Sequence, residues 1–128
     1  MRETKYPVKR VNPRFPFSAE AEILLRDGTW LPAQLAEISS RGCYIDTLEP
    51  IPVGTEFDLS ICDGVNTCEL PGKIIYEHAG GGLGITGMGV LFGHMGFEQH
   101  SAIDGWLLQL SGQGVRNMPQ RPEIRRTI

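Results

Sequence analysis

The sequence predicts an all-β fold, a six-stranded antiparallel β-barrel followed by one C-terminal α-helix. Three observations favour this fold. Short stretches alternate apolar and polar residues with the period of two that a half-buried strand requires. Asp-Gly pairs, which favour tight hairpin turns, follow two of these stretches, and a helical apolar stripe occurs only near the end of the chain. A chain of 128 residues is long enough for one domain with its own core.

Six stretches have the composition and alternation of strands. The first begins at Ala19 and leads through Asp27-Gly28, a two-residue hairpin signal, into its partner strand. Pro32 in that partner cannot donate a backbone hydrogen bond, which predicts an edge or a bulge there. We expect strands at residues 19–26, 29–38, 43–47, 56–61, 67–78 and 88–92, joined by turns short enough to close a small barrel.

The helical stripe defines the C-terminal element. Ile103, Trp106, Leu107 and Leu110 are spaced at i, i+3, i+4 and i+7, and Gly112 is suited to end the helix. We expect this helix to plug the barrel. The chain then divides into three regions: a basic N-terminal arm (1–14) kept extended by its prolines, the barrel with its helix (15–112) and a flexible basic tail (113–128).

The net charge of −3 conceals a strong separation of charge along the chain. Residues 1–14 carry +4 and residues 113–128 carry +3, whereas residues 15–112 carry −10. A body this acidic repels a nucleic-acid backbone, so we expect no nucleic-acid partner. The basic ends can still attract a small anion, or they can fold back onto the acidic body.

Two polar clusters, residues 9–14 and residues 37–42, lie far apart in the sequence. The second sits at the corner between two predicted strands, where Gly42 permits a backbone angle that other residues resist. Arg10-x-x-x-Arg14 followed by Glu37-x-Ser39-x-x-Gly42 resembles the PilZ family, whose two signatures are RxxxR and [D/N]xSxxG. The likeness extends over roughly residues 9–111 and implies a PilZ-like barrel of the kind that the strand pattern predicts.

The resemblance implies a non-enzymatic receptor for the bacterial second messenger cyclic di-GMP. PilZ proteins hold this messenger with their RxxxR arginines, so Arg10 and Arg14 would contact phosphate and guanine, which suit the planar guanidinium fork. Glu37 would accept hydrogen bonds from the guanine N1/N2 edge, Ser39 would help to fix that base, and Gly42 would allow its close approach. Further contacts could come from Lys9 and Arg41.

The basic arm has few apolar residues to anchor it, so such a receptor could signal through an arm that becomes ordered on binding. We expect the ligand to order the N-terminal arm across the barrel, and the new surface to regulate a partner protein in a process such as motility or biofilm formation. The ligand must then favour the ordered state.

Glu37 departs from the family pattern, which has Asp or Asn at this position. The side chain remains an acceptor but is longer by one methylene, so we expect binding to be weaker by about 1–2 kcal/mol. We also expect Glu37 to pair with Arg10 or Arg14 when no ligand is bound. A second hypothesis therefore stays open: a PilZ-like interaction adaptor, as in pilus or motility systems, with weak or no nucleotide binding. A third and poorer hypothesis is a nucleic-acid-binding barrel that uses the basic ends, against the acidic body and few aromatics.

The sequence contains no recognisable catalytic set and no metal-binding spacing among its histidines and cysteines. We expect no cofactor other than the ligand. Cys43, Cys62 and Cys68 are odd in number, which indicates free thiols in a reducing cytoplasm. No apolar run reaches the ~18 residues of a transmembrane helix, and the N-terminus lacks the apolar region of a secretory signal, so we expect a cytoplasmic protein without membrane insertion.

Overall fold

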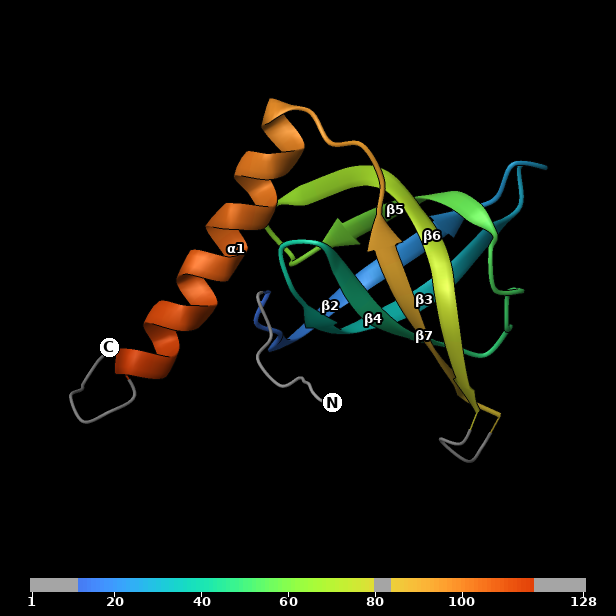
Figure 1. Ribbon diagram of the computed structural model, residues 1–128, viewed down its shortest axis with the longest axis horizontal. Coiled ribbons are helices and arrows are strands. Elements are labelled where there is room, and N and C mark those ends of the chain that lie inside the picture. Colours follow the sequence, from blue (N-terminus) through green and yellow to red (C-terminus); the bar gives the residue numbers. More distant parts are fainter. Residues whose placement is uncertain (1–11, 80–83, 117–128) are drawn as a thin grey trace, which may run out of the picture.

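The computed structural model describes residues 12–79 and 84–116, which form a closed barrel with a helix across one end (Figure 1). All strand pairs are antiparallel, and the strands follow one another around the barrel in the order β2-β3-β4-β7-β6-β5. The predicted fold class is therefore confirmed. The elements are β2 (Phe15–Leu24), β3 (Trp30–Ile38), β4 (Gly42–Thr47), β5 (Glu56–Cys62), β6 (Thr67–Ala79), β7 (Thr86–Phe92) and α1 (Phe97–Arg116).

The core of the barrel follows from the alternation of each strand. Ile23 of β2 lies opposite Leu59 of β5, and Leu35 of β3 lies opposite Ile45 of β4, and all four side chains are fully buried. Burying each such side chain contributes about 1.5–3 kcal/mol. The alternate residues face outward, and the candidate binding residues lie on this outer surface.

Pro32 lies where β3 forms a backbone ladder on one side only, and the Thr47 hydroxyl at the end of β4 donates a hydrogen bond to its carbonyl at 3.3 Å. The β2–β3 ladder continues past Pro32 to Trp30, whereas the β3–β4 ladder ends at Gln34 opposite Asp46. Proline is tolerated there because no ladder hydrogen bond to β4 is required of it. The expected edge is thus present, and the irregularity of β3 lies further along, between Leu35 and Glu37.

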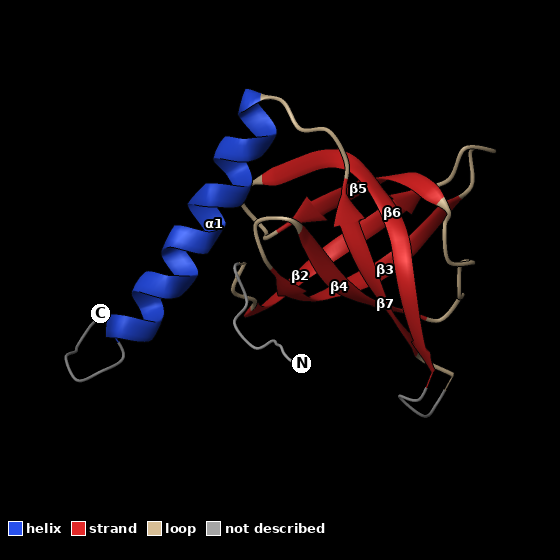
Figure 2. Cartoon of the chain, in the orientation of Figure 1, coloured by secondary structure: helices blue, strands red, loops and turns tan. Residues whose placement is uncertain are grey.

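Helix α1 closes the barrel end at which β2 and β6 begin (Figure 2). Ile103 and Trp106 are buried in the core, and the Trp106 ring lies 5.4 Å from the ring of Phe17. The predicted apolar stripe therefore faces the barrel, as a plug requires. The opposite helix face is exposed at Leu108.

The helix is longer than the stripe predicts, and the expected end at Gly112 is wrong. Its start is marked by the Gln99 side chain, whose Oε1 accepts a hydrogen bond from the Gly96 backbone N–H at 2.6 Å, one half of a capping box. Gly112 does not have the positive φ of a C′ residue, and the helix continues to Arg116. Glycine inside a helix costs about 1 kcal/mol, which a packed helix tolerates. Residues 113–116, assigned to the flexible tail, are thus helical, and the rest of that tail lies outside the described residues.

The helix is also fastened through Asp63 in the β5–β6 turn. The carboxylate accepts hydrogen bonds from the backbone N–H groups of Asn66 and Val65 at 2.6 and 2.8 Å, and from the Trp106 indole N–H at 2.8 Å. These bonds, in that order of size, lower the pKa of Asp63. Since the folded pKa lies below the unfolded value, the carboxylate stabilises the fold above about pH 4, and this contribution is lost as the pH falls.

Asp63→Asn should therefore reduce the acid sensitivity of the fold. We expect the free energy of unfolding of the wild type, measured by urea titration, to fall more steeply between about pH 5 and pH 3 than that of the variant. Asp104→Asn, on the exposed face of the same helix, is the control and should retain the wild-type slope. Equal slopes for the wild type and Asp63→Asn would contradict the assignment.

Cys43, Cys62 and Cys68 are all free. Within residues 12–79 and 84–116, His, Cys, Asp and Glu side chains do not gather in a group of three that could hold a metal ion. In the same described part of the chain, no helix has the length and apolar character needed to cross a membrane.

Candidate functional site

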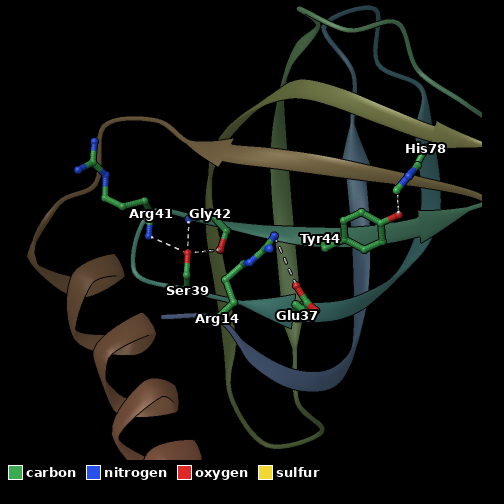
Figure 3. Close-up of polar contacts among 7 residues, drawn as sticks. All are labelled: Arg14, Glu37, Ser39, Arg41, Gly42, Tyr44 and His78. Atoms are coloured by element: carbon green, nitrogen blue, oxygen red, sulfur yellow. Dashed lines mark hydrogen bonds and ion pairs between the residues drawn. The ribbon is translucent and has the colours of Figure 1, made fainter. Parts of the chain in front are cut away.

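The end of the N-terminal arm meets the corner between β3 and β4 (Figure 3). The Ser40 hydroxyl donates a hydrogen bond to the Asn12 side-chain oxygen at 2.8 Å. Two residues along, an Arg14 guanidinium nitrogen lies 3.7 Å from a carboxylate oxygen of Glu37. The two sequence motifs, more than twenty residues apart in the chain, are therefore neighbours in the fold. Lys9 and Arg10 lie outside the described residues.

Ser39 shapes the corner from within. Its buried hydroxyl accepts hydrogen bonds from the backbone N–H groups of Arg41 and Gly42 at 3.3 and 3.2 Å, and donates to the Gly42 carbonyl at 3.2 Å. The Ser39 backbone N–H bonds the same carbonyl at 2.9 Å. This hydroxyl stabilises the tight turn between Glu37 and Arg41, so it helps to position these two side chains at the surface.

Gly42 is required for a different reason from the one that the sequence indicates. Its φ is not in the positive range that favours glycine, so the expected backbone angle is wrong. Instead, β7 crosses so closely that a Cβ on Gly42 would lie 2.2 Å from the backbone oxygen of Val90. A backbone atom in a paired strand cannot move aside cheaply, so only glycine fits.

Gly42→Ala should lower the free energy of unfolding by about 1–3 kcal/mol, the usual cost of overpacking. The matched control is Gly105→Ala on α1, where an added Cβ meets nothing within 4 Å. That change should raise stability by about 0.5–1 kcal/mol, because alanine is the better helix former. Chemical denaturation measures both, and equal and harmless effects would contradict the close approach of β7.

A β-bulge places Glu37 on the outer face of the barrel. Leu35 and Ile38 both point into the core, so strict alternation from Leu35 would also turn the side chain of residue 37 inward. The register shift between Leu35 and Glu37 inserts one extra residue and brings Glu37 opposite Tyr44. The Glu37 side chain is 43% exposed and that of Arg14 is 40% exposed, so the pair is open to a ligand.

Two tyrosines, which were not predicted from the sequence as site residues, extend this outer face over β7. The rings of Tyr44 and Tyr76 lie 6.2 Å apart, and a second bulge, between Ile74 and Tyr76, turns Tyr76 outward. Each ring covers a glycine of β7: a Cβ on Gly87 would strike the Tyr44 ring and one on Gly89 the Tyr76 ring. The result is an aromatic shelf beside the Arg14–Glu37 pair.

The surroundings of Tyr44 keep its hydroxyl uncharged at neutral pH. Partial burial raises the pKa of Tyr44, and the nearby Asp46 carboxylate raises it further. The Tyr44 hydroxyl lies 3.5 Å from Nδ1 of His78, on the side of the ring away from Arg14 (Figure 3).

One pattern in the sequence could have indicated the aromatic shelf: Gly87 and Gly89 alternate with Met88 and Val90. Glycines on one face of a strand leave room for large side chains from its neighbours.

A hollow of about 160 Å³ connects the corner to the shelf. Arg14, Ser39 and Arg41 line it on the motif side, and Ile75, Tyr76 and Leu91 line it on the side of β6 and β7. Arg41 is exposed and its guanidinium group points away from Glu37 (Figure 3). A planar group with an anionic edge could therefore meet cations, an acceptor and an apolar surface within one small area.

A family model described as the PilZ domain matches residues 9–109. The chain belongs to the PilZ family. The match covers both motifs, all six strands and most of α1. A comparison with curated protein sequences finds no significant match.

Solved structures support the same fold at low sequence identity. The PilZ domain of YcgR from Escherichia coli, solved with c-di-GMP, superposes with a TM-score of 0.71 at 13% identity, over 86% of this chain and 96% of that one. MrkH of K. pneumonia in its c-di-GMP complex gives 0.74 at 14% identity, over 87% and 56%. The Bacillus subtilis inhibitor of motility, MotI/DgrA, gives 0.65 at 12% identity, over 91% and 55%. This PilZ chain thus spans about half the length of MrkH and MotI.

Proposed function

We propose that this PilZ domain is a non-enzymatic receptor for cyclic di-GMP, held by Arg10, Arg14, Glu37 and Ser39 at the β3–β4 corner. The observation that supports it most is the meeting of the arm and the corner, through Asn12–Ser40 and Arg14–Glu37. Solved relatives of the same fold, YcgR and MrkH, carry c-di-GMP in their structures. The ligand is a dianion with two guanines, which suits arginine forks beside a carboxylate acceptor.

The ligand would exploit three features of the site in turn. Arg14 would leave Glu37 and contact a phosphate or guanine, which costs little because an exposed ion pair contributes only about 0–1 kcal/mol. Glu37 would then accept from the guanine N1/N2 edge, and the Tyr76 ring offers a flat surface for a base. Arg41, and Lys9 from the arm, would add positive charge.

Binding would hold the N-terminal arm against the barrel and present a new surface to a partner protein. The ligand can do this only if it binds the arm-held arrangement more tightly than any other. We expect hydrogen exchange of the backbone amides in residues 1–11 to slow on addition of cyclic di-GMP. Unchanged exchange with bound ligand would refute the arm switch while leaving the receptor intact.

Calorimetric titration with cyclic di-GMP is the direct test, with cyclic di-AMP as the matched control ligand. A ligand at 100 times its Kd should stabilise the domain by ~2.7 kcal/mol, visible as a raised melting temperature. A heat of binding and a raised melting temperature with cyclic di-GMP, and neither with cyclic di-AMP, would support the receptor. No shift at millimolar concentration would leave the adaptor as the better proposal.

One observation favours that adaptor. Glu37 already forms an exposed ion pair with Arg14, at 3.7 Å, so part of the attraction that the ligand would offer each group is present without it. Glutamate is longer than aspartate by one methylene, which sets the carboxylate further from the backbone. A PilZ domain in this state would act through protein contacts alone.

Glu37→Asp should therefore tighten binding of cyclic di-GMP by about 1–2 kcal/mol, roughly tenfold in Kd. Restoring the family residue shortens the side chain and weakens its pairing with Arg14. Glu22→Asp, an exposed change on β2, is the control and should leave the affinity unchanged. Weaker binding by Glu37→Asp would show that the longer side chain is the one fitted to this site.

A further inference from the structure

A second hollow, of about 610 Å³, opens on the outer surface at the far ends of β3 and β4. It exists because the β3–β4 ladder stops at Gln34 and Asp46, while β3 continues with β2 to Trp30. The gap beyond is bordered by Pro32 on β3 and by Leu48, which follows β4. It is separate from the candidate ligand site, whose lining residues lie around the other end of β4.

The hollow exposes large apolar side chains that the barrel does not use. Trp30 is 55% exposed and Leu48 is 70% exposed, and both line it together with Leu31 and Ile85. Large apolar side chains gathered around one concave surface are typical of an interaction site, whereas single exposed ones are common everywhere. A tryptophan at the edge of such a groove is also a frequent centre of binding energy.

The charged residues that line this groove favour a cationic partner. Asp46 and Glu49 contribute carboxylates to its lining, and its described lining residues include no Lys, Arg or His. An anionic ligand such as a nucleotide would be repelled, so we do not expect this groove to be an additional binding site for cyclic di-GMP. A cationic segment would be attracted, and its apolar side chains could occupy the space between Trp30 and Leu48.

We propose that this groove, bordered by Trp30, Pro32, Asp46, Leu48, Glu49 and Ile85, binds a segment of a partner protein in which Leu, Phe or Trp is flanked by Lys or Arg. This proposal rests on the proposed receptor function, because it names the surface at which the partner of the receptor would bind. Tyr44 and Asp46 are alternate outward residues of β4, about 7 Å apart. One strand therefore carries both the aromatic shelf and the groove, which gives the two sites a direct physical connection.

The test is selection of random 12-residue peptides displayed on phage against the immobilised full chain, with counter-selection against Leu48→Asp. We expect enriched sequences with basic residues around an aromatic or leucine anchor. As synthetic peptides, these should lose at least tenfold in affinity for Leu48→Asp and several-fold for Asp46→Asn combined with Glu49→Gln. Val65→Asp, at a residue 87% exposed in the β5–β6 turn, is the matched control and should bind as the wild type does.

The other outcomes overturn the proposal. They are a failure to enrich any peptide, enrichment of acidic peptides, and binding that Leu48→Asp does not alter. Saturable binding of a synthetic peptide of residues 1–11 in the groove would assign it to the chain's own arm, and a dimer that Leu48→Asp dissociates in sedimentation would assign it to a second copy. The selection is run without cyclic di-GMP, and titration of Leu48→Asp with that ligand reports separately on the receptor function.

Discussion

Trp106→Ala should lower the free energy of unfolding by about 4 kcal/mol, within the usual range for removing a large aromatic side chain from a core. Trp106 is 4% exposed, contacts Phe17 and donates its indole hydrogen bond to Asp63. Helix α1 packs mainly on β2 and β6, so this one side chain holds much of it in place. Urea unfolding followed by circular dichroism measures the loss.

Two further variants separate the causes of that loss. Trp106→Phe keeps an aromatic ring but removes the hydrogen bond to Asp63, and should cost less than Trp106→Ala. Leu108→Ala, two residues along on the exposed face, should change stability by no more than about 0.5 kcal/mol. A loss for Leu108→Ala as large as that for Trp106→Ala would mean that the helix packs through its other face.

Arg14→Ala should weaken binding of cyclic di-GMP by about 3 kcal/mol, on the order of 100-fold in Kd, if the proposed function holds. A charge-assisted, forked contact to a phosphate or guanine is among the strongest that a side chain makes. The same change should hardly affect stability, because the contact that the described residues offer Arg14, an ion pair with Glu37, is exposed. Calorimetric titration measures the affinity, and thermal unfolding checks the fold.

The control for this variant is Arg26→Ala. Arg26 also forms an exposed ion pair, with Glu56 at 3.2 Å, but lies in the β2–β3 turn away from the motif corner. Removing it changes the net charge by the same amount and should leave the affinity almost unchanged. Equal losses for the two variants would indicate general electrostatic attraction, and no loss for Arg14→Ala would remove this arginine from the proposed clamp.

The strands were predictable because each buries one face, and burial of one face imposes a period of two on the sequence. The two motifs were predictable as well, since each is a short run of side chains. The helix start was not, because its first residues lie outside the apolar stripe and are held by the Gln99 cap instead. Gly112 was misleading because a glycine that can end a helix can also continue it, as it does here without a positive φ.

The roles within the site were harder to foresee than its members. Glu37 and Tyr76 face outward only because a bulge precedes each, and a bulge leaves no clear trace in alternation. Gly42 was correctly singled out, but the reason is the carbonyl of Val90, nearly fifty residues away. The shelf of Tyr44 and Tyr76 needs three strands to exist, so no single stretch of sequence contains it.

For the described residues, the strands, their inward and outward faces and the helix could be read from the sequence, as could the PilZ signatures, because each arises from residues close to one another in the chain. The meeting of Arg14 with Glu37, the strand that requires Gly42, the aromatic shelf and the acidic groove beside Trp30 arise only when the barrel closes. Closure brings β4 against β7 and leaves β3 partly unpaired, and these pairings depend on the packing of the whole core.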